Sequence, residues 1–247
     1  MKLSLASFFL SSLLLYPSSF ATPDVAPLVR RFEAVYHSSR TLRASFLERY
    51  FDNGKEVRSE AGVAYFARPG KMRWEYTSPE VNLYVVDGKW AWFYVPADHT
   101  VTRIRVKESS DARTPLALLA GEMKVSRVCK AVEADSTAQP SNPLGMVLRC
   151  TLRGSSDGPG TAGVAKESNV SSANSYALFE LNPANGELLR VVVADPGGVL
   201  VEFRFANWEF NPPVEDAKFR FQAPRGVAIV DGDLAASGDV SGSKQVH

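Results

Sequence analysis

The 247-residue sequence is poor in the side chains that most often carry catalysis or bind metals. It has three histidines and two cysteines, and no histidine stands at metal-ligand spacing from another histidine, a cysteine or a carboxylate. The phosphate-binding loop, the dinucleotide-binding glycine motif and the G-x-S-x-G nucleophile motif are also missing. We therefore expect no catalytic site, no metal and no cofactor. The sequence contains no recognisable set of catalytic residues that would favour an enzyme.

An excess of charge of either sign is missing as well. The chain has 28 Lys and Arg residues against 27 Asp and Glu residues, which gives a formal net charge of +1 at pH 7. A balance this close to neutral provides no electrostatic reason to expect nucleic acid or an anionic membrane as the main partner.

The longest apolar run lies at the start and is too short to span a membrane. Met1 and Lys2 supply a positive start, Leu3–Tyr16 is apolar, and Ser19–Ala21 has the small-x-small pattern of a cleavage site. An N-terminal membrane anchor is the alternative, but it would need about 20 apolar residues. We expect residues 1–21 to be a signal peptide, so that the protein is exported. No cysteine stands near the cleavage site to accept a lipid anchor.

The two cysteines lie in separate strand-like runs, Val125–Val132 and Met146–Leu152. In an oxidising compartment, two such strands paired antiparallel could place Cys129 and Cys150 for a disulfide. Two buried free thiols are the alternative reading. A metal site is not expected because no second cysteine pair or nearby histidine completes a ligand set.

The rest of the chain alternates between two periodicities. Helical spacing marks Asp24–Ser38 and Pro115–Ala120, and a period of two marks runs that turn dipeptides separate. These runs are Arg43–Phe51, Glu56–Ala67, Lys71–Tyr76, Asn82–Val86, Trp90–Val95, Thr100–Val106, Val125–Val132, Met146–Leu152, Tyr176–Leu181, Leu188–Ala194 and Val199–Trp208. They predict a mainly β fold, an antiparallel sheet of eleven strands curled around helical segments.

Domain organisation follows from composition. We expect a single domain over residues 22–230, since no repeat or linker divides it. Residues 154–175 are rich in Gly, Ser and Ala and read as a flexible insertion, and residues 231–247 read as a polar tail that does not order.

The predicted strands carry many large apolar side chains. In the run Lys71–Tyr76, Met72, Trp74 and Tyr76 alternate with charged residues, so that the apolar side chains share one face and the charges share the other. Such a face can fill an ordinary core, or it can enclose an apolar cavity for a lipid-like ligand. Periodicity alone leaves both readings open.

Four motifs occur in a fixed order along the chain. They are RPGKMRWEY at 68–76, DGKWAWFY at 87–94, TPLALLA at 114–120 and DAKFRFQAPRGV at 216–227. In order and spacing they resemble the LolA family of periplasmic outer-membrane lipoprotein carriers, over nearly all of the chain after residue 21. The resemblance implies an incomplete antiparallel β-barrel of about eleven strands, closed by a helical lid, with an apolar cavity that shields acyl chains.

The resemblance also implies a location and partners. A carrier of this kind works in the periplasm as a monomer, accepts acylated lipoproteins from an ATP-driven inner-membrane release complex of the LolCDE type, and passes them to a lipid-anchored outer-membrane acceptor of the LolB type. The missing acceptor cysteine favours the carrier over the acceptor. A lipid-sensing regulatory domain of the same fold is the alternative function.

Individual side chains receive roles from the resemblance. Arg68 corresponds to an arginine that bonds backbone groups of the lid and holds the empty cavity shut, and a guanidinium with five donors needs such partners beside apolar walls. An arginine that reaches solvent from a strand end is the alternative. The implied wall of the acyl-chain cavity consists of Leu28, Phe32, Met72, Trp74, Tyr76, Trp92, Leu116 and Leu119. The cysteine pair and the 154–175 insertion are not features of the family pattern.

Overall fold

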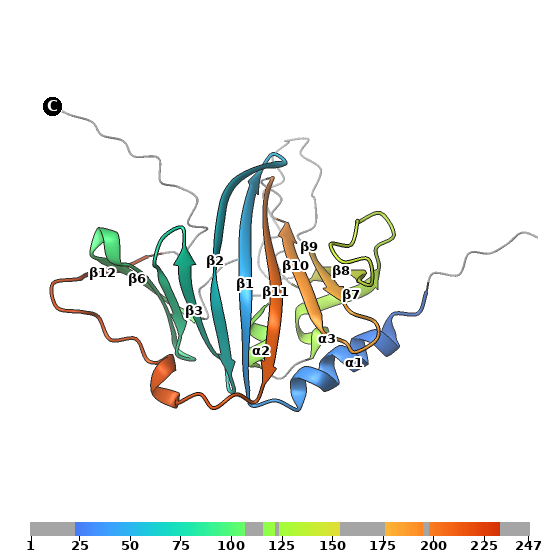
Figure 1. The fold of residues 1–247 in the computed structure, drawn as a ribbon, viewed down its shortest axis with the longest axis horizontal. Coiled ribbons are helices and arrows are strands. Elements are labelled where there is room, and N and C mark those ends of the chain that lie inside the picture. Colours follow the sequence, from blue (N-terminus) through green and yellow to red (C-terminus); the bar gives the residue numbers. More distant parts are fainter. Residues whose placement is uncertain (1–22, 107–115, 122–123, 154–175, 195–197, 233–247) are drawn as a thin grey trace, which may run out of the picture.

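The structure is a computed structural model that describes residues 23–106, 116–121, 124–153, 176–194 and 198–232. Its strands form one open sheet of twelve strands in the order β12-β6-β5-β4-β3-β2-β1-β11-β10-β9-β8-β7 (Figure 1). The predicted signal peptide, the 154–175 insertion and nearly all of the predicted tail lie outside the described residues. Within the described segments, no helix has the length and apolar character needed to cross a membrane.

The strands agree closely with the sequence prediction. They are β1 (Thr41–Asp52), β2 (Lys55–Ala67), β3 (Lys71–Ser78), β4 (Leu83–Val86), β5 (Trp90–Val95), β6 (Thr100–Arg105), β7 (Cys129–Ala134), β8 (Met146–Leu152), β9 (Tyr176–Leu181), β10 (Leu188–Ala194), β11 (Val199–Phe210) and β12 (Ala228–Asp231). Every neighbouring pair is antiparallel except β12 with β6. The predicted fold class, a mainly β and incompletely closed antiparallel sheet, is confirmed.

The twelfth strand was not predicted. β12 is four exposed residues long and pairs in parallel with the edge strand β6. Its contacts begin where the Ala228 N–H donates to the His99 carbonyl at 3.0 Å, and they end where Arg103 Nε donates to the Asp231 carboxylate at 2.5 Å. A run this short and exposed has no face pattern to detect, because neither side of it is buried. Asp231, the first residue of the predicted tail, therefore ends a strand.

In the described part of the chain, three α-helices accompany the sheet: α1 (Ala26–His37), α2 (Ala117–Ala120) and α3 (Val125–Val128), with 3₁₀ turns at η1 (Pro96–Asp98) and η4 (Asp216–Phe219). Near the start of α1, Asp24 Oδ1 accepts the Ala26 N–H at 2.9 Å. The residues of α3 were predicted to begin a strand, and this is a correction. The four-residue turn forms because its first N–H donates to a carboxylate of α1, a long-range contact that no local pattern reveals.

The two faces of the sheet differ in what they contact. We call the face that packs against the helices the inner face and the opposite one the outer face. Along β1, every second residue from Leu42 to Tyr50 is buried on the inner face. In Figure 1, α2 and α3 lie behind the middle of the sheet, and α1 runs along its lower edge toward the start of β1. The main core lies between the inner face and these helices.

The chain after β11 crosses the outer face. Arg73 Nη1 of β3 donates to the Lys218 carbonyl in η4 at 3.0 Å, and Phe219 is buried with 1% of its surface exposed. Further on, the ring of Phe221 stacks on that of Trp92 with centroids 5.4 Å apart. In Figure 1 this orange and red segment runs from the foot of β11 to β12 at the other side of the sheet. The outer face of β3 to β5 is therefore partly covered by the protein itself.

Candidate ligand-binding site

An aromatic layer forms the floor of the inner face. Register places Ala64, Trp74 and Tyr84 side by side on β2, β3 and β4. Trp74 is fully buried, and its ring lies 4.7 Å from that of Phe46 and 5.5 Å from that of Phe203 in edge-on contacts. Edge-on pairs of this kind stabilise a packed interior without directional polar bonds. The floor is therefore apolar, and it is built from residues far apart in sequence.

Helix α1 covers one side of this floor. Its buried residues, Leu28, Phe32 and Tyr36, recur every four positions and so form one stripe. The Tyr36 ring packs edge-on against Trp208 at 5.2 Å, and its hydroxyl accepts the Leu188 N–H at 2.9 Å. Burial raises the pKa of Tyr36, so the hydroxyl stays protonated at any physiological pH. The helix thus lies on the β10 and β11 half of the sheet.

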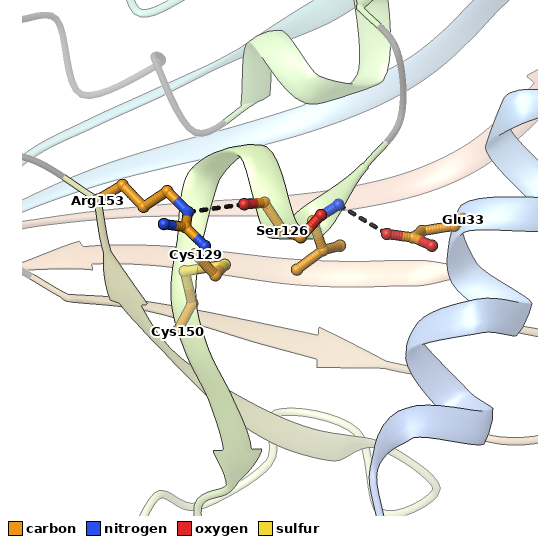
Figure 2. The surroundings of a disulfide bond; sticks show 6 residues. Glu33, Ser126, Cys129, Cys150 and Arg153 are labelled. Atoms are coloured by element: carbon orange, nitrogen blue, oxygen red, sulfur yellow. Dashed lines mark hydrogen bonds between the residues drawn. A yellow bond between two sulfur atoms is a disulfide. The ribbon is translucent and has the colours of Figure 1, made fainter.

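Helices α2 and α3 complete the cover. Leu116 and Leu119 at α2 have at most 1% of their surface exposed, and α2 contacts β2 and β3. Figure 2 shows how α3 is held between α1 and the last strands: Glu33 Oε1 of α1 accepts the Val125 N–H at 2.7 Å. At the other end of α3, a disulfide joins Cys129 and Cys150 (Figure 2). The cover is therefore anchored to both halves of the sheet.

One turn contacts both α1 and α2. Between β2 and β3, Arg68 Nη2 donates to the Tyr36 carbonyl at 2.8 Å and Nη1 donates to the His37 carbonyl at 2.5 Å. Two residues on, the Gly70 N–H donates to the Ala120 carbonyl of α2 at 2.7 Å. A cation at the last carbonyls of a helix also interacts favourably with the helix dipole. Burial lowers the pKa of Arg68, so the guanidinium gives up part of its hydration to make these bonds.

The residues implied to form a cavity wall come together, with one exception. The wall residues that share the continuous inner core are Leu28, Phe32, Met72, Trp74, Tyr76, Leu116 and Leu119. Trp92 is the exception and a correction to the prediction. It is paired with Val85 and Arg103 on the outer face, and its indole N–H donates to Asp87 at 3.1 Å. In this strand the inner-face aromatic is its neighbour Phe93, which lies across from Tyr84.

Other inner-face residues were not assigned to the wall from the sequence. Those that add to the aromatic layer are Phe46, Phe66, Phe179, Phe203, Phe205 and Trp208. Two polar side chains lie among them: Glu48 has no exposed surface, and Asn82 is 7% exposed. The period of two in β1 was the available signal, because it puts Glu48 in phase with Phe46 and Tyr50.

A pocket of about 510 Å³ opens on the outer face, beside the segment after β11. Its lining combines the charged side chains of Arg43, Glu209 and Lys218 with Tyr65 and the apolar stretch 212–214. Lys218 Nζ lies 4.1 Å from the centre of the Tyr65 ring, and Arg43 forms an ion pair with Glu209. Charges this close to the surface do not suit an acyl chain. The apolar surface is instead on the inner face, where the protein's own helices cover it.

Within the described residues, no group of three or more His, Cys, Asp or Glu side chains is arranged to hold a metal ion. The inner face offers apolar packing and a few buried hydrogen-bonding groups. Buried residues of α1 and α2 belong to the same continuous core as Trp74.

Known proteins provide an independent comparison. The family model described as outer membrane lipoprotein carrier protein LolA matches residues 37–141. The outer-membrane lipoprotein carrier protein of Chromobacterium violaceum is 30% identical over 217 residues, which cover 87% of this chain and 93% of that protein. The protein of the same name from Nitrosomonas europaea is 28% identical over 212 residues, covering 84% of this chain and 91% of that protein.

Among solved structures, a LolA superfamily protein from Nitrosomonas europaea aligns with a TM-score of 0.41 at 9% identity, covering 81% of this chain and 98% of that one. The sequence relatives are the stronger comparison, because the first of them matches nearly end to end. The resemblance expected from the four motifs is confirmed. The chain belongs to the LolA family of outer-membrane lipoprotein carrier proteins.

Proposed function

We propose that this protein is a non-catalytic periplasmic chaperone that shields the acyl chains of lipoproteins on its inner face while they cross between membranes. The observation that carries the proposal is the combination of an inner face lined mainly by aromatic and aliphatic side chains with a cover of short helices. The floor around Trp74 and the apolar stripe of α1 bury one another in this closed form. A curated relative named as an outer-membrane lipoprotein carrier supports the same function.

The energetics explain why such a cover is needed. Each CH₂ group removed from water contributes about 0.8 kcal/mol, so an acylated protein leaves a membrane at a useful rate only if another apolar surface receives its chains. The inner face offers that surface when the side chains of α1 move away from it. Closing must be favourable by only a few kcal/mol, since a much larger preference would keep the ligand out.

Arg68 is the proposed latch of the closed form. Its hydrogen bonds to the carbonyls of Tyr36 and His37 exist only while α1 lies against the turn. A hydrogen bond from a charged donor contributes roughly 1.5–3 kcal/mol. Without these bonds the closed form gains less on release of the ligand, so the carrier holds its ligand longer.

The latch is tested by Arg68→Leu in a transfer assay with purified lipoprotein and an outer-membrane acceptor of the LolB type. We expect the variant to fold and bind lipoprotein but to transfer it poorly. The matched control is Arg40→Leu. Arg40 is exposed, and the hydrogen bonds described for it are made by its backbone N–H and carbonyl. Normal transfer by Arg68→Leu would show that Arg68 does not act as a latch.

The chaperone function itself is tested with spheroplasts. Purified protein is incubated with them, and the medium is examined for soluble one-to-one complexes with lipoproteins released by the ATP-driven inner-membrane complex. Release without the added protein is the control. If the protein takes up free fatty acid but no lipoprotein appears in the medium, the lipid-sensing alternative is favoured instead.

A further inference from the structure

The inner face changes character along β1 and β2. Close to the helices, cross-strand neighbours are apolar, as in the pair Leu42 and Phe66. Further along the same face, Glu48 lies directly opposite Glu60, and these two residues have 0% and 9% of their surface exposed. Buried carboxylates on a face otherwise made of rings require a specific set of partners.

Glu48 is held by two tyrosines of the same face. The Tyr50 hydroxyl donates to its Oε1 at 2.5 Å, and the Tyr76 hydroxyl donates to its Oε2 at 2.6 Å. Gly62 of β2 pairs with Tyr76 of β3 and leaves no room for a side chain of its own. A Cβ at that position would lie 1.9 Å from the Glu75 carbonyl oxygen and 3.0 Å from the Phe46 ring. The Glu48 carboxylate thus has two hydrogen-bond donors within an otherwise apolar face.

Asn82 provides an independent observation beside this group. Its carbonyl accepts the Tyr76 N–H at 3.0 Å, and it stands two residues before Tyr84, an inner-face residue opposite Trp74. Alternation along the chain therefore puts the Asn82 side chain on the inner face as well. Its Oδ1 is buried and has no hydrogen-bond partner in the described structure. An unpartnered buried acceptor is rare and calls for a donor.

We propose that Asn82 Oδ1, next to the Glu48, Tyr50 and Tyr76 group, binds an N–H donor at the head of an acylated ligand. This proposal rests on the carrier function proposed above. The donor is an amide N–H or an ammonium group adjoining the acyl chains. An ester linkage does not meet the requirement, because it has acceptors only. With the head held there, the chains lie over the neighbouring floor of Phe46 and Trp74, which explains how a largely non-directional surface fixes the orientation of its ligand.

The test compares matched probes on the intact protein. The first is a fluorescent peptide with an N-palmitoyl amide, and the second is the same peptide with an ester oxygen in place of that N–H. A third carries an S-hexadecyl cysteine with a free α-ammonium group. Dissociation constants are measured by fluorescence anisotropy. We expect at least one N–H probe to bind on the order of tenfold more tightly than the ester, the difference that one recovered hydrogen bond produces.

Variants then assign the preference to Asn82. In Asn82→Leu the ratio of ester to N–H dissociation constants falls to about one. In Asn82→Asp, which keeps an acceptor and adds a charge, the ammonium probe gains over the amide probe. Circular dichroism and urea unfolding check that each variant folds. The ratio of probe dissociation constants for the unmodified protein tests the proposal even if a variant fails to fold.

The outcomes separate the two proposals. Equal binding of the ester and both N–H probes, or a preference that survives in Asn82→Leu, overturns the head-group site while leaving the carrier function intact. Failure of all three probes to bind overturns the carrier function itself. An advantage of the amide alone or of the ammonium alone supports the site and identifies which donor it prefers.

Discussion

The inner and outer faces of the same strands are stabilised by different kinds of contact. In β3, Met72, Trp74 and Tyr76 face inward among other rings, whereas Arg73 on the outer face bonds Glu75 at 2.7 Å. The inner contacts of this strand are largely edge-on aromatic pairs, and the Tyr76 hydroxyl adds one hydrogen bond to Glu48. Because alternate side chains of a strand point to opposite faces, one sheet can carry an apolar surface on one face and ion pairs on the other. Ion pairs that join neighbouring strands hold them together without contacting the apolar surface.

The outer face is held by charge at its centre. Glu202 of β11 is 4% exposed and accepts hydrogen bonds from Arg49, Arg190 and Arg204. Burial raises the pKa of Glu202, but the hydrogen bonds from these arginines outweigh that effect and hold the pKa below its ordinary value. The carboxylate therefore links β1, β10 and β11 as an anion. The inner face of the same strands relies mainly on packed apolar side chains instead.

The largest expected effect separates two tryptophans on opposite faces. Trp74→Ala removes a fully buried ring from the inner floor and should lower the free energy of unfolding by about 3–5 kcal/mol. Trp92→Ala is the matched control, because Trp92 is only half-buried on the outer face. We expect it to cost less than half as much. Urea unfolding measures both, and equal losses would show that the two faces are not packed differently.

The next effect concerns the edge where the cover is anchored. Cys129 and Cys150 are 21 positions apart, and a cross-link closing a loop of that length stabilises by about 3 kcal/mol. Replacing both with serine should therefore move the urea midpoint down strongly. Dithiothreitol should do the same to the unmodified protein but leave the double variant unaffected. A midpoint that changes under neither treatment would show that the bond contributes nothing to this edge.

A smaller effect is expected from the charged centre of the outer face. Glu202→Gln keeps the shape of the side chain but leaves three arginines without their buried anion, at a cost of about 1–3 kcal/mol. Glu56→Gln is the control, because Glu56 is 41% exposed and pairs with Arg49 at 3.2 Å, and exposed pairs contribute about 1 kcal/mol or less. Urea unfolding at pH 7 compares them. A loss no larger for Glu202→Gln would mean that burial adds nothing to the network.

The smallest effect is a pH dependence at Asp135 on the outer face. Hydrogen bonds from Thr137, Ala138 and Arg149 lower the pKa of Asp135 to about 2, against a burial effect in the opposite direction. Because the pKa is lowered in the folded state, the ionised carboxylate stabilises the protein at pH values above its unfolded pKa of about 4. This stabilisation is lost as the pH falls toward 2. Asp135→Asn should flatten the decline in stability between pH 4 and pH 2. An unchanged slope would assign that decline to other carboxylates.

The strands of the sheet were predictable from sequence, but the face on which a given side chain lies was not always predictable. Long strands such as β1 and β2 alternate clearly, and turn dipeptides mark their ends, so local signals suffice. In β5, Trp92 and Phe93 are neighbours of similar size, and only pairing with Tyr84 decides which faces inward. The error at Trp92 follows from that ambiguity, because a shift of one residue exchanges the two faces.

The cover was harder to predict for a different reason. The turn of α3 depends on Glu33, 92 residues earlier in the chain, and β12 depends on an edge strand that precedes it by more than a hundred residues. The position of Arg68 followed from the family motif rather than from its chemistry, because strand-end arginines usually reach solvent. Tertiary contacts decided each of these features, and local pattern could not supply them.

The central claim is that acyl chains bind on the inner face after the helices move. It is tested most directly with a palmitoylated peptide that carries a photoreactive diazirine near the end of its chain. After illumination, mass spectrometry locates the labelled residues of the unmodified protein. We expect labels on inner-face residues such as Phe66, Met72 and Trp74. Labels concentrated at Trp92 and Phe221 on the outer face would contradict it.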